Sequence, residues 1–219
     1  MTDVEHWTNF YKQGTAPTKP SSFAEWVRTH ELYPSGAGTL VEIGCGNGRD
    51  AVFFAQDEGK SVIATDPAAG FVPPLDLPNI KFIQLSATSA GFRELLGSTN
   101  PSIVYGRFVL HALKRSEVQS LLQTLSMCLR PGSVVFFETR SVSDPLFGNG
   151  ERVAGSLSAF VTPGATPGSL PHFRRFSTAE ELTQDISGAG LSVHACFEDR
   201  MSSWHGDDHA AVIRAVALV

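Results

Sequence analysis

Residues 41–50 contain an acidic side chain, Glu42, that is followed by three alternating glycines. Glu42, Gly44, Gly46 and Gly48 form the pattern E-x-G-x-G-x-G. Glycines at this spacing let the backbone turn sharply and approach a ligand that any Cβ atom would keep at a distance, and the acid can accept hydrogen bonds from a cationic or hydroxylated group. The pyrophosphate fingerprint and the P-loop fit this spacing less well. The motif therefore indicates a nucleotide-type site that does not require a phosphate.

The residues on either side predict the elements that would position this motif. Residues 39–43 are a short apolar run, residues 49–58 have helical spacing, and residues 61–65 are typical of a strand. Together they predict a strand, a helix and a second strand in one βαβ unit. The second strand ends at Asp66, about 22 residues beyond Gly44, where a doubly wound sheet places the carboxylate that accepts hydrogen bonds from ribose hydroxyls.

With Asp66, the acid-and-glycine motif resembles that of the class I S-adenosylmethionine-dependent methyltransferases, and the resemblance covers most of the chain. It implies that the cofactor is S-adenosylmethionine and that the product is S-adenosylhomocysteine. The residues that it assigns to the methionine end of the cofactor are Glu42, Gly44, Cys45 and Gly46. It assigns Asp66 to the ribose.

The sequence departs from this family at the position expected to contact adenine. An acidic residue after the third strand commonly meets the adenine amino group in the family, but this chain has Ser86 there. A contact through a carboxylate is therefore not expected. We expect Ser86, Ala87 through its backbone, or Thr88 to take its place.

The remainder of the chain continues the alternation of strands and helices. The patterns predict strands at 79–85, 102–110, 133–139, 191–197 and 210–219, and helices around 92–96, 115–129 and 178–187. Only a short polar loop separates the last two strands, which indicates an antiparallel pair. We therefore expect an α/β fold with a doubly wound, Rossmann-like, seven-stranded sheet, mostly parallel, in a single domain spanning residues 1–219.

Two segments are predicted to cover the site. Residues 144–176 contain nine Gly and Pro residues, which argues against a long regular helix, and long irregular loops in compact domains often form lids. Residues 1–36 carry Trp7, Phe10 and Tyr11 and resemble the N-terminal caps of small-molecule methyltransferases, which fold over the cofactor. The alternatives are a surface insertion without a role and an aromatic patch that packs on the sheet.

Acceptor chemistry is expected after the fourth and fifth strands, because ligands of doubly wound sheets bind beyond the carboxyl ends of the strands. His111 is a candidate general base for a hydroxyl acceptor, although a histidine beside Leu110 and Leu113 is also a common packing residue. Arg107 lies near the end of a largely apolar strand. Such an arginine favours contact with a carboxylate or phosphate, so Arg107 is the second catalytic candidate.

Further residues are predicted to contact the acceptor: Tyr11, Arg140, His172 and Arg174. For Arg140, a structural ion pair with Asp144 is the alternative. Residues 44–50, 105–111, 138–144 and 172–176 together resemble bacterial methyltransferases that act on sugars and glycan ends. If that holds, a set of arginines would bind a phosphorylated or carboxylated acceptor. A phosphate oxygen is already an anion, so in that case no general base is needed.

The composition limits the range of partners and metals. A net charge of −5 without a Lys or Arg run argues against a dedicated nucleic-acid surface, and no stretch reaches the roughly 18 apolar residues of a membrane span. Cys45, Cys128 and Cys196 are far apart, which argues against disulfides and a zinc site and favours the cytoplasm. Residues 205–209 hold two His and two Asp without a further ligand cluster, so we expect a metal-independent reaction.

Three functions follow from these observations. The first is O-methylation of a small-molecule or glycan-linked acceptor. The second is S- or N-methylation, as in thiopurine and tellurite methyltransferases, which also have a tryptophan-rich N-terminal cap. The third is a non-catalytic module that binds the cofactor and has lost acceptor chemistry. The oligomeric state is left open.

Overall fold

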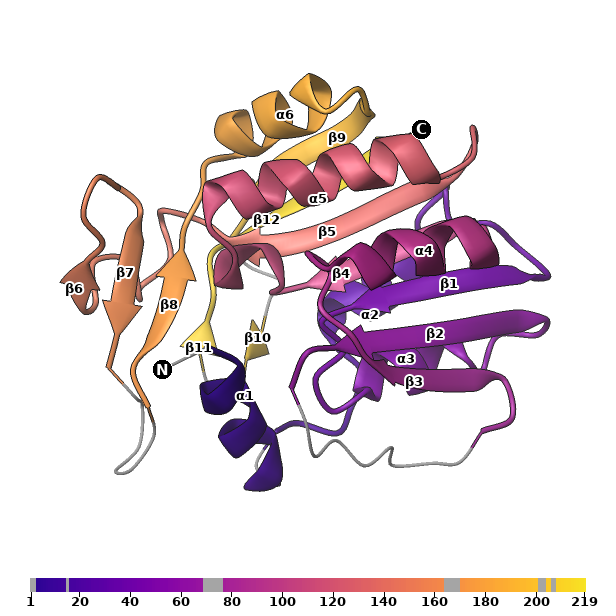
Figure 1. Cartoon of the computed structure of the whole chain (residues 1–219), viewed down its shortest axis with the longest axis horizontal. Coiled ribbons are helices and arrows are strands. Elements are labelled where there is room, and N and C mark those ends of the chain that lie inside the picture. The colour runs from indigo at the N-terminus through magenta and orange to yellow at the C-terminus, as the bar shows by residue number, and fades with distance from the viewer. Residues whose placement is uncertain (1–2, 15, 69–76, 164–169, 201–203, 206–207) are drawn as a thin grey trace.

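The computed structural model describes residues 3–14, 16–68, 77–163, 170–200, 204–205 and 208–219, and a seven-stranded sheet lies at its centre (Figure 1). The strand order is β3-β2-β1-β4-β5-β12-β9. The strands are β1 (Gly38–Ile43), β2 (Lys60–Asp66), β3 (Ile80–Gln84), β4 (Ile103–Arg107), β5 (Val134–Arg140), β9 (Ser192–Asp199) and β12 (Val212–Leu218). Strands β1 to β5 pair in parallel, whereas β12 is antiparallel to both β5 and β9. The predicted fold class is confirmed, including the antiparallel pairing of the last two long strands.

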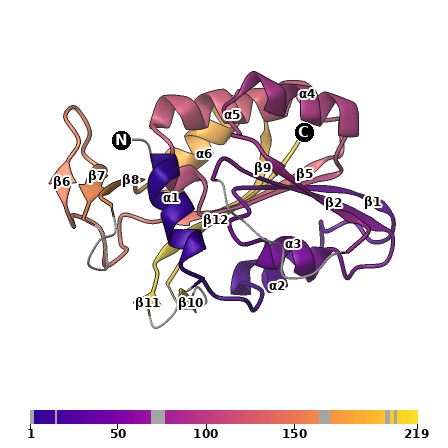
Figure 2. The ribbon, with the colours of Figure 1, turned by 60° about the horizontal axis from the view of Figure 1, so that its bottom comes forward.

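Helices cover both faces of this sheet (Figure 2). The helices α2 (Ser22–Arg28) and α3 (Arg49–Phe54) lie on one face, and α4 (Ala90–Thr99), α5 (Arg115–Cys128) and α6 (Ala179–Gly188) lie on the other. Because its strands are buried on both faces, the centre of the sheet is built from nearly continuous apolar runs. Phe136 and Phe137 are consecutive in β5 and belong to apolar clusters on opposite faces. Among the described helices, none is long and apolar enough to cross a bilayer.

The carboxyl ends of the parallel strands meet along one side of the sheet, which we call the carboxyl edge. Two segments lie beside it in Figure 1. One is α1 (Asp3–Lys12), and the other is a small antiparallel sheet of β6 (Glu151–Arg152), β7 (Ala159–Thr162) and β8 (His172–Arg175). Strand β8 contacts both α1 and the 3₁₀ helix η1 (Leu110–Ala112) that follows β4. Segments from three distant parts of the sequence therefore meet at this edge. The remaining two-residue strands, β10 (Trp204–His205) and β11 (Asp208–His209), pair with each other.

Three local expectations differ from the structure. The fourth strand ends at Arg107 instead of residue 110, because Phe108 adopts a positive φ of 55° and the chain turns into η1. The helix expected over 49–58 ends at Phe54, and turns follow that end with Gly59 at a φ of 77°. The segment 144–176 was expected to be irregular, yet its described part contains β6, β7 and β8, because short runs that favour strands lie between its glycines and prolines. Residues 164–169 of that segment lie outside the described part, and its role as a lid stays a prediction.

Candidate cofactor and acceptor site

The glycine motif forms the loop between β1 and α3 at the carboxyl edge. Gly44, Gly46 and Gly48 have φ values of 69°, 55° and 73°, in the left-handed region where a side chain is strained. The N–H groups of Gly44 and Cys45 donate to the Thr65 carbonyl at 2.7 and 3.0 Å, which fixes the start of the loop against β2. These glycines are therefore required by the backbone conformation as well as by any ligand.

Close contacts give a second reason for two of these glycines. A Cβ atom on Gly44 would lie 3.2 Å from the Cβ of Val109. A Cβ atom on Gly46 would collide with the hydroxyl group and ring of Tyr11, which reaches the loop from α1. The N-terminal helix is thus folded down onto the loop, and Tyr11 covers its middle glycine.

Two carboxylates flank the loop. Glu42, at the end of β1, is 3% exposed, and its Oε2 atom has no hydrogen-bond partner in the part of the chain that the structure describes. Burial and the nearby carboxylate of Asp50 raise the pKa of Glu42 well above its ordinary value. Asp66, at the end of β2, accepts hydrogen bonds from the N–H groups of Gly46 and Ala68 at 2.9 and 2.8 Å. Burial raises the pKa of Asp66 and these two hydrogen bonds oppose that rise. The loop therefore presents two partly desolvated acids, an arrangement that favours a cationic, hydroxyl-bearing ligand.

Glu138 of β5 lies between two arginines of the neighbouring strands. It is in register with Arg107 of β4 and with Arg214 of β12. Glu138 Oε1 accepts a hydrogen bond from Arg107 Nε at 2.9 Å, and Oε2 accepts one from Arg214 Nε at 3.1 Å. Arg214 Nη1 also lies 3.1 Å from a carboxylate oxygen of Asp199. Arg107 does meet an anion, but that anion is the carboxylate of a neighbouring strand.

Arg140 forms a second buried ion pair, with its Nη1 atom 2.6 Å from Asp144 Oδ2. This pair is the structural alternative considered for Arg140. Both Arg107 and Arg140 also lie against Phe108, with guanidinium carbons 4.1 and 5.0 Å from the ring centroid. Arg107 Nη2 and Arg140 Nε are buried without a hydrogen-bond partner among the described residues. Each arginine therefore keeps one donor nitrogen that a ligand or water could satisfy.

Imidazole rings from three segments gather at the same edge. His6 of α1 stacks on His172 of β8, with ring centroids 3.8 Å apart and an interplanar angle of 16°. Burial, with the positive charge of Arg174 as the next cause, lowers the pKa of His172 to about 4. His111 in η1 is 3% exposed, and its ring centroid is 6.4 Å from that of Trp7. The structure therefore brings the predicted acceptor residues from the cap, η1 and the insertion together.

The comparison with known families shows the family to which the chain belongs. A family model described as a methyltransferase domain matches residues 20–195, which include every strand from β1 to β8. The chain belongs to the S-adenosylmethionine-dependent methyltransferases. No curated protein matches the sequence.

Solved structures support the same fold for this methyltransferase. A SAM-dependent methyltransferase from Methanosarcina mazei has a TM-score of 0.67 and 12% identity, covering 85% of this chain and 95% of that one. The 1,6-didemethyltoxoflavin-N1-methyltransferase of Burkholderia thailandensis, with bound 1,6-didemethyltoxoflavin and S-adenosylhomocysteine, has a TM-score of 0.63 and 16% identity, covering 89% and 75%. The [4+2]-cyclase SpnF has a TM-score of 0.65 and 13% identity, covering 98% and 92%. At these identities the likeness shows the fold alone.

The cofactor is S-adenosylmethionine, and the geometry of the glycine loop fits it. When bound, it supplies a methyl group that is already activated on a sulfonium. The unpartnered Oε2 atom of Glu42 would accept a hydrogen bond from the ammonium group at the methionine end. Asp66 would use its remaining lone pairs for the ribose hydroxyls.

The remaining predicted cofactor residues lie nearby with more ordinary contacts. The Ser86 hydroxyl is 2.9 Å from that of Thr88, and Ala87 is buried. The thiol of Cys45 is buried in the loop, and burial raises its pKa well above the ordinary value. Residues 69–76 lie outside the described part. The assignment of adenine contacts to Ser86 and Ala87 stays a prediction, as do the catalytic and acceptor roles given above.

Two residues at this edge were missed in the sequence. Glu138 was noted only as the end of the fifth strand, and its pairing with Arg107 and Arg214 depends on the strand register. Asp50 was given no role of its own, whereas its carboxylate accepts three hydrogen bonds from distant segments. A buried acid at the start of a helix was the available signal. The side chains of residues 205–209, considered above for a metal, lie outside the described part.

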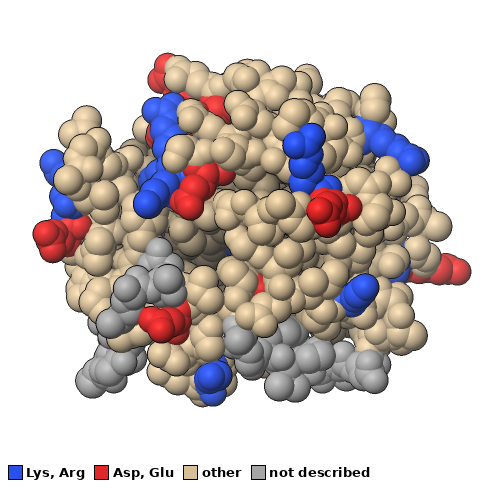
Figure 3. All heavy atoms as spheres, in the orientation of Figure 1, with Lys and Arg blue, Asp and Glu red and all other residues tan. Residues whose placement is uncertain are grey.

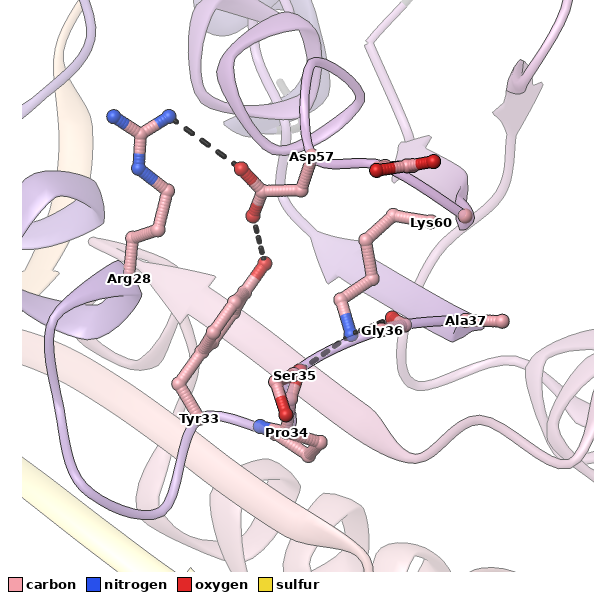
Figure 4. Close-up of a pocket in the computed structure, with 10 residues that line it drawn as sticks. Arg28, Tyr33, Pro34, Ser35, Gly36, Ala37, Asp57 and Lys60 are labelled. Carbon is pink, nitrogen blue, oxygen red and sulfur yellow. Dashed lines mark hydrogen bonds and ion pairs between the residues drawn. The ribbon is translucent and has the colours of Figure 1, made fainter.

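A separate hollow of about 630 Å³ lies at the opposite side of the sheet, the amino edge (Figure 4). Four of its polar side chains contact one another or the backbone. The Tyr33 hydroxyl donates to Asp57 Oδ2 at 2.6 Å, Arg28 lies 3.5 Å from the same carboxylate, and Lys60 Nζ donates to the carbonyls of Pro34 and Gly36 at 2.6 and 2.8 Å (Figure 4). These contacts give the side chains around the hollow a structural role.

Proposed function

We propose that this methyltransferase O-methylates a small or glycan-linked acceptor that carries a phosphate or carboxylate group. Two arginines beside Phe108 support this proposal. Arg107 Nη2 and Arg140 Nε are buried, and neither has a hydrogen-bond partner among the described residues. Leaving such donors unsatisfied in a dry site costs on the order of 1–3 kcal/mol each. An anionic oxygen that accepts from both would recover that free energy.

The proposed roles follow from the chemistry of methyl transfer. The acceptor oxygen must lie in line with the sulfonium, and orientation of this kind supplies on the order of 7–11 kcal/mol. Tyr11, Arg140, His172 and Arg174 would hold the acceptor, and α1 with the β6–β8 sheet would exclude water. For a hydroxyl acceptor, His111 would remove the proton during attack. For a phosphate or carboxylate oxygen no base is required, and Arg107 would act by positioning the anion.

The proposed partners are small. Basic and acidic side chains are interspersed on the face shown in Figure 3, without a continuous basic patch among the described residues there. Such a surface favours a small-molecule or glycan acceptor over nucleic acid or a membrane. The three widely spaced cysteines favour the cytoplasm as its compartment.

N-methylation is the second candidate. The structurally similar enzyme of Burkholderia thailandensis is an N1-methyltransferase of 1,6-didemethyltoxoflavin. The buried, stacked rings of His6 and His172, with Trp7 edge-on to His172, would suit a flat heterocyclic acceptor of that kind.

The decisive experiment compares matched acceptors in one methyl-transfer assay. Sugars and simple hydroxy compounds would be tested with and without a phosphate or carboxylate, beside heterocyclic amines and thiols. We expect methylation only of the anionic hydroxy compounds or of their anionic oxygens. His111→Ala then separates the two cases, since it lowers turnover of a neutral hydroxyl far more than cofactor affinity and leaves an anionic oxygen nearly unaffected. Preferred methylation of an amine or thiol would overturn the proposal, and turnover of none would favour a non-catalytic cofactor-binding module.

A further inference from the structure

The side chains between and after the glycines contact the N-terminal segment. Asn47 Nδ2 donates a hydrogen bond to the Pro17 carbonyl at 2.8 Å, and Arg49 Nη1 donates one to the Lys19 carbonyl at 3.2 Å. The loop that binds the cofactor is therefore also the surface on which the chain between α1 and α2 is held. Both contacts are exposed, so each contributes little alone.

Asp50 provides the buried part of this attachment. Its carboxylate accepts hydrogen bonds from the Ser21 N–H and Oγ and from the Tyr105 hydroxyl, each at 2.7 Å, and the residue is only 3% exposed. Ser21 Oγ in turn accepts the N–H of Ala24 and caps α2. One carboxylate thus ties together the first turn of α3, the start of α2 and strand β4. Hydrogen bonds to a charged acceptor in a dry environment are the strong ones.

We propose that Asp50 is a positioning residue that holds the N-terminal segment closed over the glycine loop and thereby sets how fast the cofactor and its product leave. Asp50 acts through Tyr11, the residue of that segment that lies over Gly46. Burial raises the pKa of Tyr11, so the group that covers the loop is a neutral phenol at physiological pH. This role of Asp50 concerns access to the cofactor and goes beyond the choice of acceptor.

The physical basis is a closed and an open state of the N-terminal segment. Release of the cofactor requires Tyr11 to leave Gly46, and the segment that carries Tyr11 is anchored at Ser21 by Asp50. Weakening the anchor raises the population of the open state and the rate of release, without changing the groups around the transferring methyl.

Tyr105→Phe is the cleanest test, because it removes one hydrogen bond to Asp50 and leaves the α2 cap intact. Asp50→Asn is the stronger variant, because it removes the charge. Dissociation of S-adenosylhomocysteine would be measured by surface plasmon resonance, with tryptic cleavage after the exposed Lys12 as the readout of cap opening. We expect dissociation to be about threefold faster in Tyr105→Phe and more than tenfold faster in Asp50→Asn, with faster cleavage in both.

Tyr33→Phe is the matched control. Tyr33 donates to Asp57 at 2.6 Å beyond the other end of α3, so the control loses the same kind of hydrogen bond away from the loop (Figure 4). We expect it to lower the melting temperature without changing dissociation or cleavage. If the Asp50 and Tyr105 variants change dissociation no more than Tyr33→Phe does, Asp50 serves stability alone and the proposal is wrong. Because no acceptor is used, failure of the acceptor proposal does not affect this test.

Discussion

The two edges of the sheet differ in whether their polar groups have hydrogen-bond partners. At the amino edge, Tyr33 donates to Asp57 and Lys60 donates to backbone carbonyls, so these groups beside the hollow in Figure 4 already have partners. At the carboxyl edge, Glu42 and Arg107 each keep a buried polar atom without a hydrogen-bond partner in the described structure. The hollow in Figure 4 and the buried polar atoms without partners are therefore at different places.

This difference shows which feature indicates function. An unsatisfied buried donor or acceptor costs on the order of 1–3 kcal/mol, and it persists where a ligand or water completes it. A hollow whose walls bond to one another carries no such cost. We therefore expect substitutions at the carboxyl edge to change ligand binding, and substitutions at the amino edge to change stability alone.

The largest effect is expected for Gly46→Val. The substitution places a branched side chain at a φ of 55° where it collides with Tyr11, so it distorts the loop that would hold the cofactor. We expect S-adenosylmethionine affinity to fall by at least about 1,000-fold, or ~4 kcal/mol, in calorimetry. Gly36→Val is the matched control, because Gly36 also has a positive φ of 80° but an added Cβ meets nothing within 4 Å. Equal losses in both variants would contradict a cofactor site at Gly46.

Glu42→Gln is expected to lower cofactor affinity by about 100-fold, or ~2.7 kcal/mol, because it removes the charge that meets the ammonium group. It should also stabilise the free protein at high pH. Burial holds the pKa of Glu42 above its ordinary value of 4.5, so the folded state binds this proton more tightly than the unfolded state. Stability of the natural chain therefore falls as pH rises above about 4.5, and the glutamine variant lacks this loss.

Unfolding of both proteins in urea between pH 4.5 and 8.5 checks the second part. The variant should match the natural chain at the lowest pH and exceed it at the highest. A constant difference across the range would mean that Glu42 is ionised without cost in the free protein. Lower affinity of Glu42→Gln for S-adenosylmethionine at every pH would then be the only remaining support for a role of Glu42 in binding the cofactor.

The cofactor half of the site could be predicted because it is local in sequence. Glu42, the three glycines and Asp66 lie within one βαβ unit, where strand and helix patterns fix their relative positions. The residues that contact adenine were harder to predict, because Ser86 replaces the expected acid. The fold could be predicted from the alternation of strands and helices, although the crossovers from β3 to β4 and from β5 to β9 join strands that are not neighbours in the sheet.

The acceptor half depends on long-range register. Glu138 meets Arg107 and Arg214 only when β12 pairs antiparallel with β5 at one particular alignment. A shift of one residue would turn Arg214 to the other face. The sequence pattern also does not predict that His6 and His172, which are far apart in the chain, stack on each other. The ion pair between Arg140 and Asp144 could be predicted, because those residues are four apart in the sequence.

His172 should make the fold sensitive to acid. Burial and Arg174, then His6 and Arg140, lower its pKa to about 4, so the folded state binds this proton less tightly than the unfolded state does. Stability is therefore lost as pH falls from about 6.5 towards 4, by roughly 2 kcal/mol between pH 7 and pH 5. His172→Gln should remove that part of the dependence in urea unfolding. Glu42 acts in the opposite direction in both proteins, so the difference between them isolates His172; an identical slope would show that the His6 stack tolerates the charge.

The smallest effect is expected at the amino edge, for Lys60→Met. The ammonium group of Lys60 donates to two carbonyls, but the hollow admits water, which can replace those hydrogen bonds. We expect a loss of about 1 kcal/mol in the free energy of unfolding. Cofactor affinity and turnover should stay within about twofold of the natural chain, a difference of ~0.4 kcal/mol. If Lys60→Met weakened cofactor binding as strongly as Glu42→Gln does, the two edges would be coupled, and paired polar groups would be as informative about function as unpaired ones.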